Sequence, residues 1–130
     1  MKMQFPCEIL VKNILPAIRA IMVKELSEKY NKSQKEIAEL LGITQPSVSY
    51  YLHGERGERA IDIIKETKNI HDKILELLEG LVTSQITCNN LLKAICTICL
   101  EIRPIYIQKV CPDKFEFLKD WNVCFKEVKQ

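Results

Sequence analysis

The apolar positions of this chain recur at the three- and four-residue spacing of a helix rather than at the two-residue spacing of a strand. Residues 8–30 show the pattern first, with Lys and Glu opposite the apolar side and with Pro16 marking an entry or a break. Two shorter segments follow, residues 33–42 and 44–54, and each ends at a glycine. The first begins with a capping box, in which Ser33 can cap and Glu36 can reach back, and the second begins with Thr44, which can also cap a helix. We expect one helix in each of these segments.

A longer amphipathic stretch covers residues 58–85. One row of positions alternates by four and three, as in a heptad repeat, and consists of Ile63, Thr67, Ile70, Ile74, Leu77, Leu81 and Ser84. A second apolar row consists of Ile61, Ile64, Leu75, Leu78 and Val82. The pattern predicts one long helix, with one row facing a second copy of the chain and the other facing its own core.

The remaining segments are also mostly helical in pattern. Residues 89–102 predict an apolar helix closed by Arg103-Pro104, residues 105–110 fit a helix or a strand, and a last amphipathic helix is expected from Pro112 onwards. The predicted fold class is therefore all-α. We expect a helix-turn-helix domain over residues 1–57, followed over residues 58–130 by a long dimerisation helix and a small C-terminal helical region, with the boundary at the polar connection 54–57.

Residues 33–54 have the spacing of a helix-turn-helix. Ala38 is small, as needed where two helices cross closely, and Gly42 suits the tight turn between them. Val48 and Leu52 would bury the inner face of the second helix. The alternative is an ordinary helical hairpin within a bundle.

The outer face of the second helix is short, polar and without an acidic residue, which suits insertion into the major groove of DNA. Gln45 and Tyr50 are the expected base contacts. Ser33 and Gln34, at a helix N-terminus, and Arg56, in the following loop, are the expected phosphate contacts, with a solvated surface charge as the alternative for Arg56. The full predicted interface comprises Ser33, Gln34, Thr44, Gln45, Ser47, Ser49, Tyr50 and Arg56.

The segment from Gln34 to Leu52 resembles the XRE/Cro/C1 type of helix-turn-helix. The wider run over residues 5–57 resembles the N-terminal half of a group of archaeal regulators of this type. Some of those regulators continue into a thiamine-phosphate synthase-like domain, and others into a short cysteine-bearing region, which residues 58–130 resemble more. The resemblance implies a dimeric repressor or activator with a helical DNA-binding domain, and it does not indicate the effector.

Composition and charge narrow the function class. The formal net charge is only +2 over 130 residues, so affinity for DNA must come from the placement of residues and not from a basic tail. No uncharged apolar run approaches the length of a membrane span, and no signal-peptide pattern begins the sequence, so we expect a cytoplasmic protein. No Ser/His/Asp or paired-carboxylate constellation indicates an enzyme.

The cysteines are the second chemical signal. Cys96 and Cys99 lie three residues apart, on one face of a helix, and Cys88 and Cys111 would complete a four-ligand set. Their apolar flanks favour an iron–sulfur cluster, expected as 4Fe–4S, over zinc. Zinc or another metal, a thiol–disulfide switch and small buried hydrophobes remain as alternatives. Cys88 can join only if the helix begins after it, while Cys7 and Cys124 are interpreted as structural, Cys124 being a reserve ligand.

The expected function is therefore that of a homodimeric, sequence-specific transcriptional regulator that binds double-stranded operator DNA. In the first hypothesis its cluster senses redox state, oxygen or cluster supply. In the alternative, the cysteines hold zinc or are purely structural, and the C-terminal half only dimerises. A redox enzyme that uses Cys96 and Cys99 ranks below both.

Overall fold

The computed structural model describes residues 8, 10–54, 58–110 and 112. The described part of the chain contains no strand, which confirms the all-α class. A π-helical turn, η1 (Leu10–Ile14), is followed by six α-helices: α2 (Leu15–Glu28), α3 (Gln34–Leu41), α4 (Gln45–His53), α5 (Glu58–Glu66), α6 (Lys68–Val82) and α7 (Cys88–Val110).

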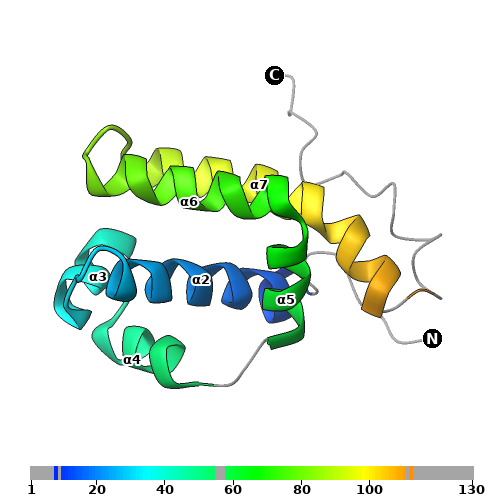
Figure 1. Cartoon of the computed structure of the whole chain (residues 1–130), viewed down its shortest axis with the longest axis horizontal. Helices are drawn as coiled ribbons and strands as arrows, with labels where there is room; N and C mark the ends of the chain where they lie inside the picture. Colours follow the sequence, from blue (N-terminus) through cyan, green and yellow to red (C-terminus); the bar gives the residue numbers. More distant parts are fainter. Residues whose placement is uncertain (1–7, 9, 55–57, 111, 113–130) are drawn as a thin grey trace.

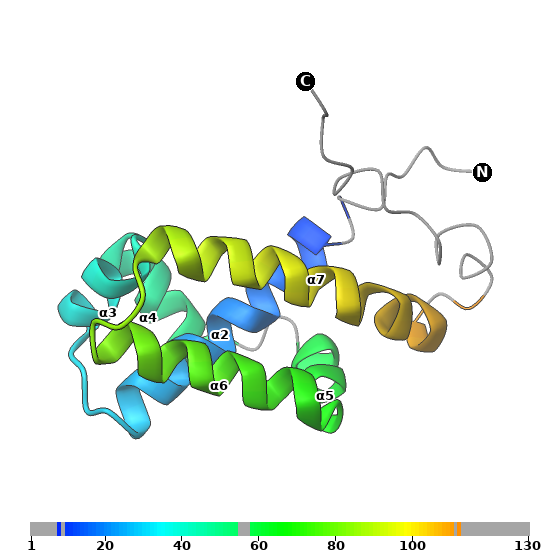
Figure 2. The ribbon, with the colours of Figure 1, turned by 90° about the horizontal axis from the view of Figure 1, so that it is seen from above.

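Helix α2 is the central element of the fold. It lies between α4 on one side and the hairpin of α6 and α7 on the other, with α5 crossing at its end (Figure 1). Seen from above, α6 and α7 run side by side with α2 beneath them (Figure 2). Pro16 sits in the first turn of α2, where its missing N–H is not needed. The buried side chains of α2 are Ala17, Ile18, Ala20, Ile21, Met22, Val23 and Leu26.

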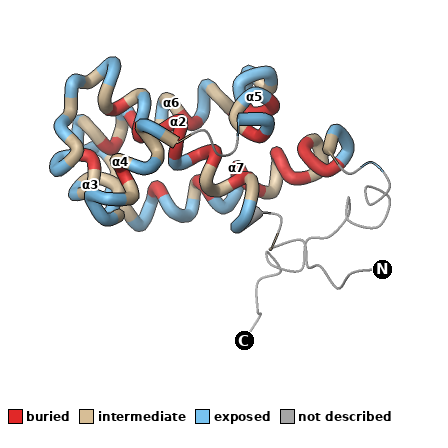
Figure 3. Tube along the Cα trace, turned by 90° about the horizontal axis from the view of Figure 1, so that it is seen from below, coloured by how far each residue is buried: buried red, intermediate tan, exposed pale blue. Residues whose placement is uncertain are grey.

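One hydrophobic core joins the two halves of the chain. Ile37 of α3 and Val48 of α4 are fully buried in the same cluster as Ile64, Ile74 and Ile102 from the later helices. Figure 3 shows the buried residues mostly where the helices lie against one another, with exposed residues mostly along the outer sides. The two-domain division stays a prediction, and three residues of its expected boundary, 55–57, lie outside the described residues.

The single long helix predicted over residues 58–85 is wrong. The chain forms two helices that meet at Thr67, whose backbone is not helical and whose hydroxyl donates a hydrogen bond of 2.9 Å to the carbonyl of Ile63. The heptad row is not free to meet a second copy, because Ile70 and Ile74 are each only 1% exposed within one chain. The bend at Thr67 lets the apolar rows of both helices pack on the same core.

The predicted helix end at Arg103-Pro104 is also wrong. Helix α7 continues through Pro104 to Val110, although a proline inside a helix removes one backbone hydrogen bond. Tyr106 and Ile107 continue beyond the proline the apolar side to which Ile102 belongs. All three are buried, and the burial of the two later side chains offsets the cost of roughly 3 kcal/mol. The last predicted helix, after Pro112, lies outside the described residues.

The turn between α3 and α4 depends on Gly42, whose φ of +67° lies in the left-handed region. We predict that Gly42→Ala lowers the free energy of unfolding by about 1–2 kcal/mol, because a Cβ disfavours this backbone conformation. Urea denaturation followed by circular dichroism measures the change. Gly80→Ala is the matched control, since a Cβ there meets only the Ile86 side chain at ordinary contact distance inside a helix. Equal stability of the two variants would contradict this account of the turn.

Candidate nucleic-acid interface

The first helix of the motif begins with the predicted capping box. The backbone N–H of Ser33 donates to the Glu36 carboxylate, and the backbone N–H of Glu36 donates to the Ser33 hydroxyl, both at 3.2 Å. The hydrogen bonds with Ser33, backbone first, lower the pKa of the Glu36 carboxyl, and Lys32 lies 3.7 Å from it. Both polar groups of Ser33 are therefore already used inside the protein.

The turn and the second cap follow directly. Gly42 ends α3, and Thr44 opens α4 by accepting a hydrogen bond from the backbone N–H of Ser47 at 3.3 Å. The two hydroxyls of Thr44 and Ser47 also bond to each other at 2.7 Å. These predicted DNA contacts thus serve first as structural groups, because they hold the beginning of α4 in place.

The inner face of α4 fixes the orientation of the helix. Val48 is fully buried, and Leu52, Ala38 and Leu41 are partly buried against the same core. Sequence reasoning expected Val48 and Leu52 on the inner face and Ala38 where the two helices cross, and the packing agrees with that expectation. Since α4 also packs on α2, its opposite side must face solvent (Figure 1).

That opposite side carries the predicted reading residues. Gln45 is exposed, Tyr50 is 45% exposed, and Ser49 is half-buried between them. The rings of Tyr50 and Tyr51 meet edge to face, with their centroids 5.5 Å apart. The face therefore presents an amide, a hydroxyl and a phenol without a carboxylate among residues 44–54. Arg56 lies outside the described residues, so its role stays a prediction.

Of the predicted phosphate contacts, Gln34 is the better placed. Its backbone N–H is in the first turn of α3, where no intrahelical carbonyl can accept it, and its side chain is half-buried. Lys35, exposed beside it, adds a positive charge that the sequence interpretation did not single out. A capped helix start followed by a lysine is the signal that could have identified Lys35.

The cysteines do not come together as the predicted ligand set requires. Helix α7 begins at Cys88, so Cys88 lies two helical turns, or ~12 Å along the axis, from Cys96. Cys88 instead lies near the turn of the motif, with its Sγ 4.0 Å from the position of a Cβ built on Gly42. A shared site requires a helix that begins after Cys88, but α7 begins at Cys88 itself. Cys88 therefore cannot share a site with Cys96.

Cys96 and Cys99 have different surroundings although they share a helix. Cys96 is exposed and Cys99 is buried, and burial, aided by the nearby Cys96, raises the pKa of the Cys99 thiol to about 12. Among the described residues, no three His, Cys, Asp or Glu side chains gather where they could hold a metal ion. Cys111 lies outside the described residues. The described residues therefore do not fit a four-cysteine cluster, and the iron–sulfur site stays a prediction.

Arg103 is a feature that the sequence interpretation missed. It is only 2% exposed, and its Nε and Nη1 have no hydrogen-bond partner among the described residues. Burial of such groups costs free energy, so stability alone does not explain an arginine at this position. Because Arg103 precedes Pro104, the sequence indicated a helix end there. It therefore gave no sign that Arg103 is buried within a continuous α7.

We predict that Cys96 and Cys99 differ sharply in reactivity. At pH 8 iodoacetamide should alkylate Cys96 within minutes and leave Cys99 protected, because Cys99 is buried and remains a thiol far below a pKa of about 12. Mass spectrometry of peptides from the native and the urea-unfolded protein measures this difference. A metal or cluster held by both thiolates would protect both cysteines until chelation, which would contradict the environments described here.

The comparisons with known proteins agree with the geometry of α3 and α4. A family model described as helix-turn-helix matches residues 23–65, about a third of the chain. Comparisons with curated proteins and with solved structures found no significant match. Separately, no helix of the described residues has the length and apolar character that crossing a membrane requires. The match confirms the motif predicted over residues 33–54, and α3 and α4 form the helix-turn-helix of a DNA-binding module.

Proposed function

We propose that this protein is an XRE-type, sequence-specific transcriptional regulator that inserts α4 into the major groove of double-stranded DNA. The observation that carries the proposal is the outer face of α4, where Gln45 and Tyr50 are exposed beside a polar surface without carboxylates. An amide side chain can pair with adenine through two hydrogen bonds, and a phenol can contact a base edge or a phosphate. The packing of α4 on α2 supports a rigid presentation of these side chains.

The start of α3 supplies a second contact in this proposal. The backbone N–H groups of Gln34 and Lys35 lack intrahelical acceptors, and a phosphate oxygen can accept them. The ionised Glu36 opposes an anion there, while Lys32, at 3.7 Å from it, and Lys35 offset that charge. This contact would orient the module on the phosphate backbone of the DNA without contributing to sequence recognition.

The proposal includes two copies on one operator. The reading face is short and the net charge is only +2, so a single module has little electrostatic affinity to hold it on DNA. Two modules related by a twofold axis read half-sites about one helical turn, ~34 Å, apart. The predicted heptad contact between copies is not available because Ile70 and Ile74 are buried within the chain. The two copies must therefore meet through another surface.

Substitutions on the outer face of α4 test the reading residues. After selection of preferred sequences from a random DNA pool, Gln45→Ala and Tyr50→Ala should each weaken binding to the selected site by about 5- to 150-fold, corresponding to 1–3 kcal/mol. Binding to unrelated DNA should change little, because base contacts carry the loss. Fluorescence anisotropy at fixed salt concentration measures both affinities.

Gln108→Ala is the matched control, since Gln108 is an exposed glutamine on α7, away from the motif. It should bind the selected site like the natural chain. If Gln45→Ala and Gln108→Ala have equal affinities, α4 does not read the sequence. If Gln45→Ala loses affinity for the selected site and for unrelated DNA to the same extent, Gln45 contacts the DNA backbone and not a base.

The spacing of the selected site tests the two-copy arrangement. A palindromic site should bind two chains cooperatively, and an insertion of five base pairs between its halves should abolish the tight complex, because it turns the half-sites to opposite sides of the duplex. Light scattering of the complex counts the chains. One bound chain, with the half-site and the palindrome equal in affinity, would refute this arrangement.

A further inference from the structure

A groove with a volume of about 540 Å³ runs between α6 and α7, outside the DNA-binding module. It lies along the α6–α7 hairpin that covers α2 in Figure 2. Its volume falls within the range of about 300–1,000 Å³ that is typical of small-molecule sites. Nothing in the proposed DNA contacts uses this groove, so its chemistry has to be considered separately.

The groove combines apolar walls with a polar rim. Leu77 and Gly80 of α6 line it together with Ala94 and Ile98 of α7. Ile86, in the connection between the two helices, closes the apolar part, and its side chain would lie 3.4 Å from a Cβ at Gly80. Such walls favour a ligand with an apolar body.

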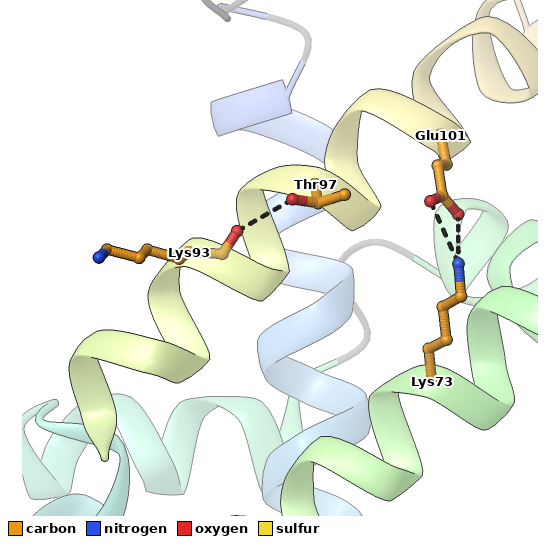
Figure 4. Close-up of polar contacts among 4 residues, drawn as sticks. All are labelled: Lys73, Lys93, Thr97 and Glu101. Carbon is orange, nitrogen blue, oxygen red and sulfur yellow. Dashed lines mark hydrogen bonds and ion pairs between the residues drawn. The ribbon is translucent and has the colours of Figure 1, made fainter. Parts of the chain in front are cut away.

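The rim of the groove is acidic. Lys73 of α6 and Glu101 of α7 form an ion pair of 3.0 Å that spans the two helices (Figure 4). Glu76 and Glu79 also line the groove, are exposed, and have no ion-pair partner among the described residues. One ammonium group thus stands against three carboxylates, so the rim carries a net charge of −2. An occupant with a positive charge would complement it.

The groove is also limited in length. The Lys73–Glu101 ion pair crosses one end, and residues 83–86 of the connection bound the other end. Thr83 follows Lys73 by ten positions, which corresponds to ~15 Å along the helix axis. A compact molecule fits between these limits.

A second copy of the chain is also a poor occupant. Figure 1 shows the α6–α7 hairpin on the side of α2 opposite α4. A twofold contact through this groove would direct the two α4 helices away from each other, and they could not read one DNA duplex. The position of the groove therefore favours a small ligand.

We propose that the α6–α7 groove is a binding site for a small amphipathic organic cation, with an ammonium or amidinium head and an aromatic or aliphatic body. The body lies against Leu77, Ala94 and Ile98, and the head lies beside Glu76 and Glu79. The exclusion of a second copy rests on the proposed function, but the site itself contains no residue of α3 or α4. It can therefore be tested in the absence of DNA.

Two probes with the same aromatic body and opposite charge test the site. Phenylethylammonium and 3-phenylpropanoate are titrated separately into the ¹⁵N-labelled full chain, and amide chemical shifts are followed by NMR. The cation should give saturable shifts within residues 73–86 and 94–101. It should bind about tenfold more tightly than the anion at low salt, because two unpaired carboxylates face it. Equal affinities, or shifts confined to other residues, would overturn the proposal.

Charge variants identify the head-group contact. Glu76→Gln combined with Glu79→Gln should weaken binding of the cation by about three- to tenfold, as expected for two exposed charge pairs. Asp62→Asn combined with Asp72→Asn removes the same charge outside the groove and should leave the affinity unchanged. An equal effect of the two double variants would show attraction by net charge alone and would refute the site.

Filling the groove gives the last test. Thr97 is exposed and its hydroxyl bonds only to the Lys93 carbonyl of its own helix, so Thr97→Trp should fold normally while abolishing binding of the cation. Gln108→Trp, on an exposed position of the same helix, is the control. Retained binding in Thr97→Trp overturns the proposal. A fall of the molar mass from dimer to monomer in Thr97→Trp would also overturn it, since the groove would then be an interface between copies.

Discussion

The burial of α2 over most of its circumference is the constraint on which the rest of the structure depends. Ile18, Val23 and Leu26 are fully buried, and the helix packs on α3 and α4 as well as on α5 and α6. Residues 20–23 are four consecutive buried positions, so the middle turn of α2 must be covered on all sides, while Arg19 and Lys24 beside it stay exposed. The motif covers one side and the C-terminal helices cover the other. The orientation of α4 toward solvent therefore depends on residues throughout the chain, although the motif itself is short. Because the core is shared, a change in the packing of the α6–α7 hairpin also changes the packing beneath α3 and α4.

The features that the sequence predicted correctly depend on interactions between residues close together in the chain. The capping box of Ser33 and Glu36, the left-handed glycine at position 42 and the buried Val48 are all decided by neighbours within a few residues, and the structure has each as expected. The errors came from elements that tertiary packing decides. The heptad row at Ile70 and Ile74 correctly indicated buried positions, but the pattern does not say whether the covering surface belongs to the same chain. Pro104 marked a helix end by its local preference, and the buried side chains beyond it outweighed that preference.

The candidate sites divide in the same way. The exposed face with Gln45 and Tyr50 follows from helical periodicity alone, while the use of the Thr44 and Ser47 hydroxyls in the cap appears only in three dimensions. The four cysteines matched a ligand set by residue type, but the start of α7 at Cys88 separates Cys88 from Cys96, and Cys111 lies outside the described residues. The α6–α7 groove could not be predicted from the sequence, because Glu76 and Thr97 line the same groove only once α6 and α7 have packed side by side. Residues close in the chain are thus predicted well, and sites built across helices are not.

The central claim is that the exposed face of α4 reads DNA while the α6–α7 hairpin stays away from it. Hydrogen–deuterium exchange of the full chain, with and without a selected operator, tests this claim most directly. The account predicts new protection at residues 33–36 and 45–53, and unchanged exchange over residues 73–82 and 94–101. Protection concentrated on α6 and α7, with α4 exchanging as in the free protein, would contradict it.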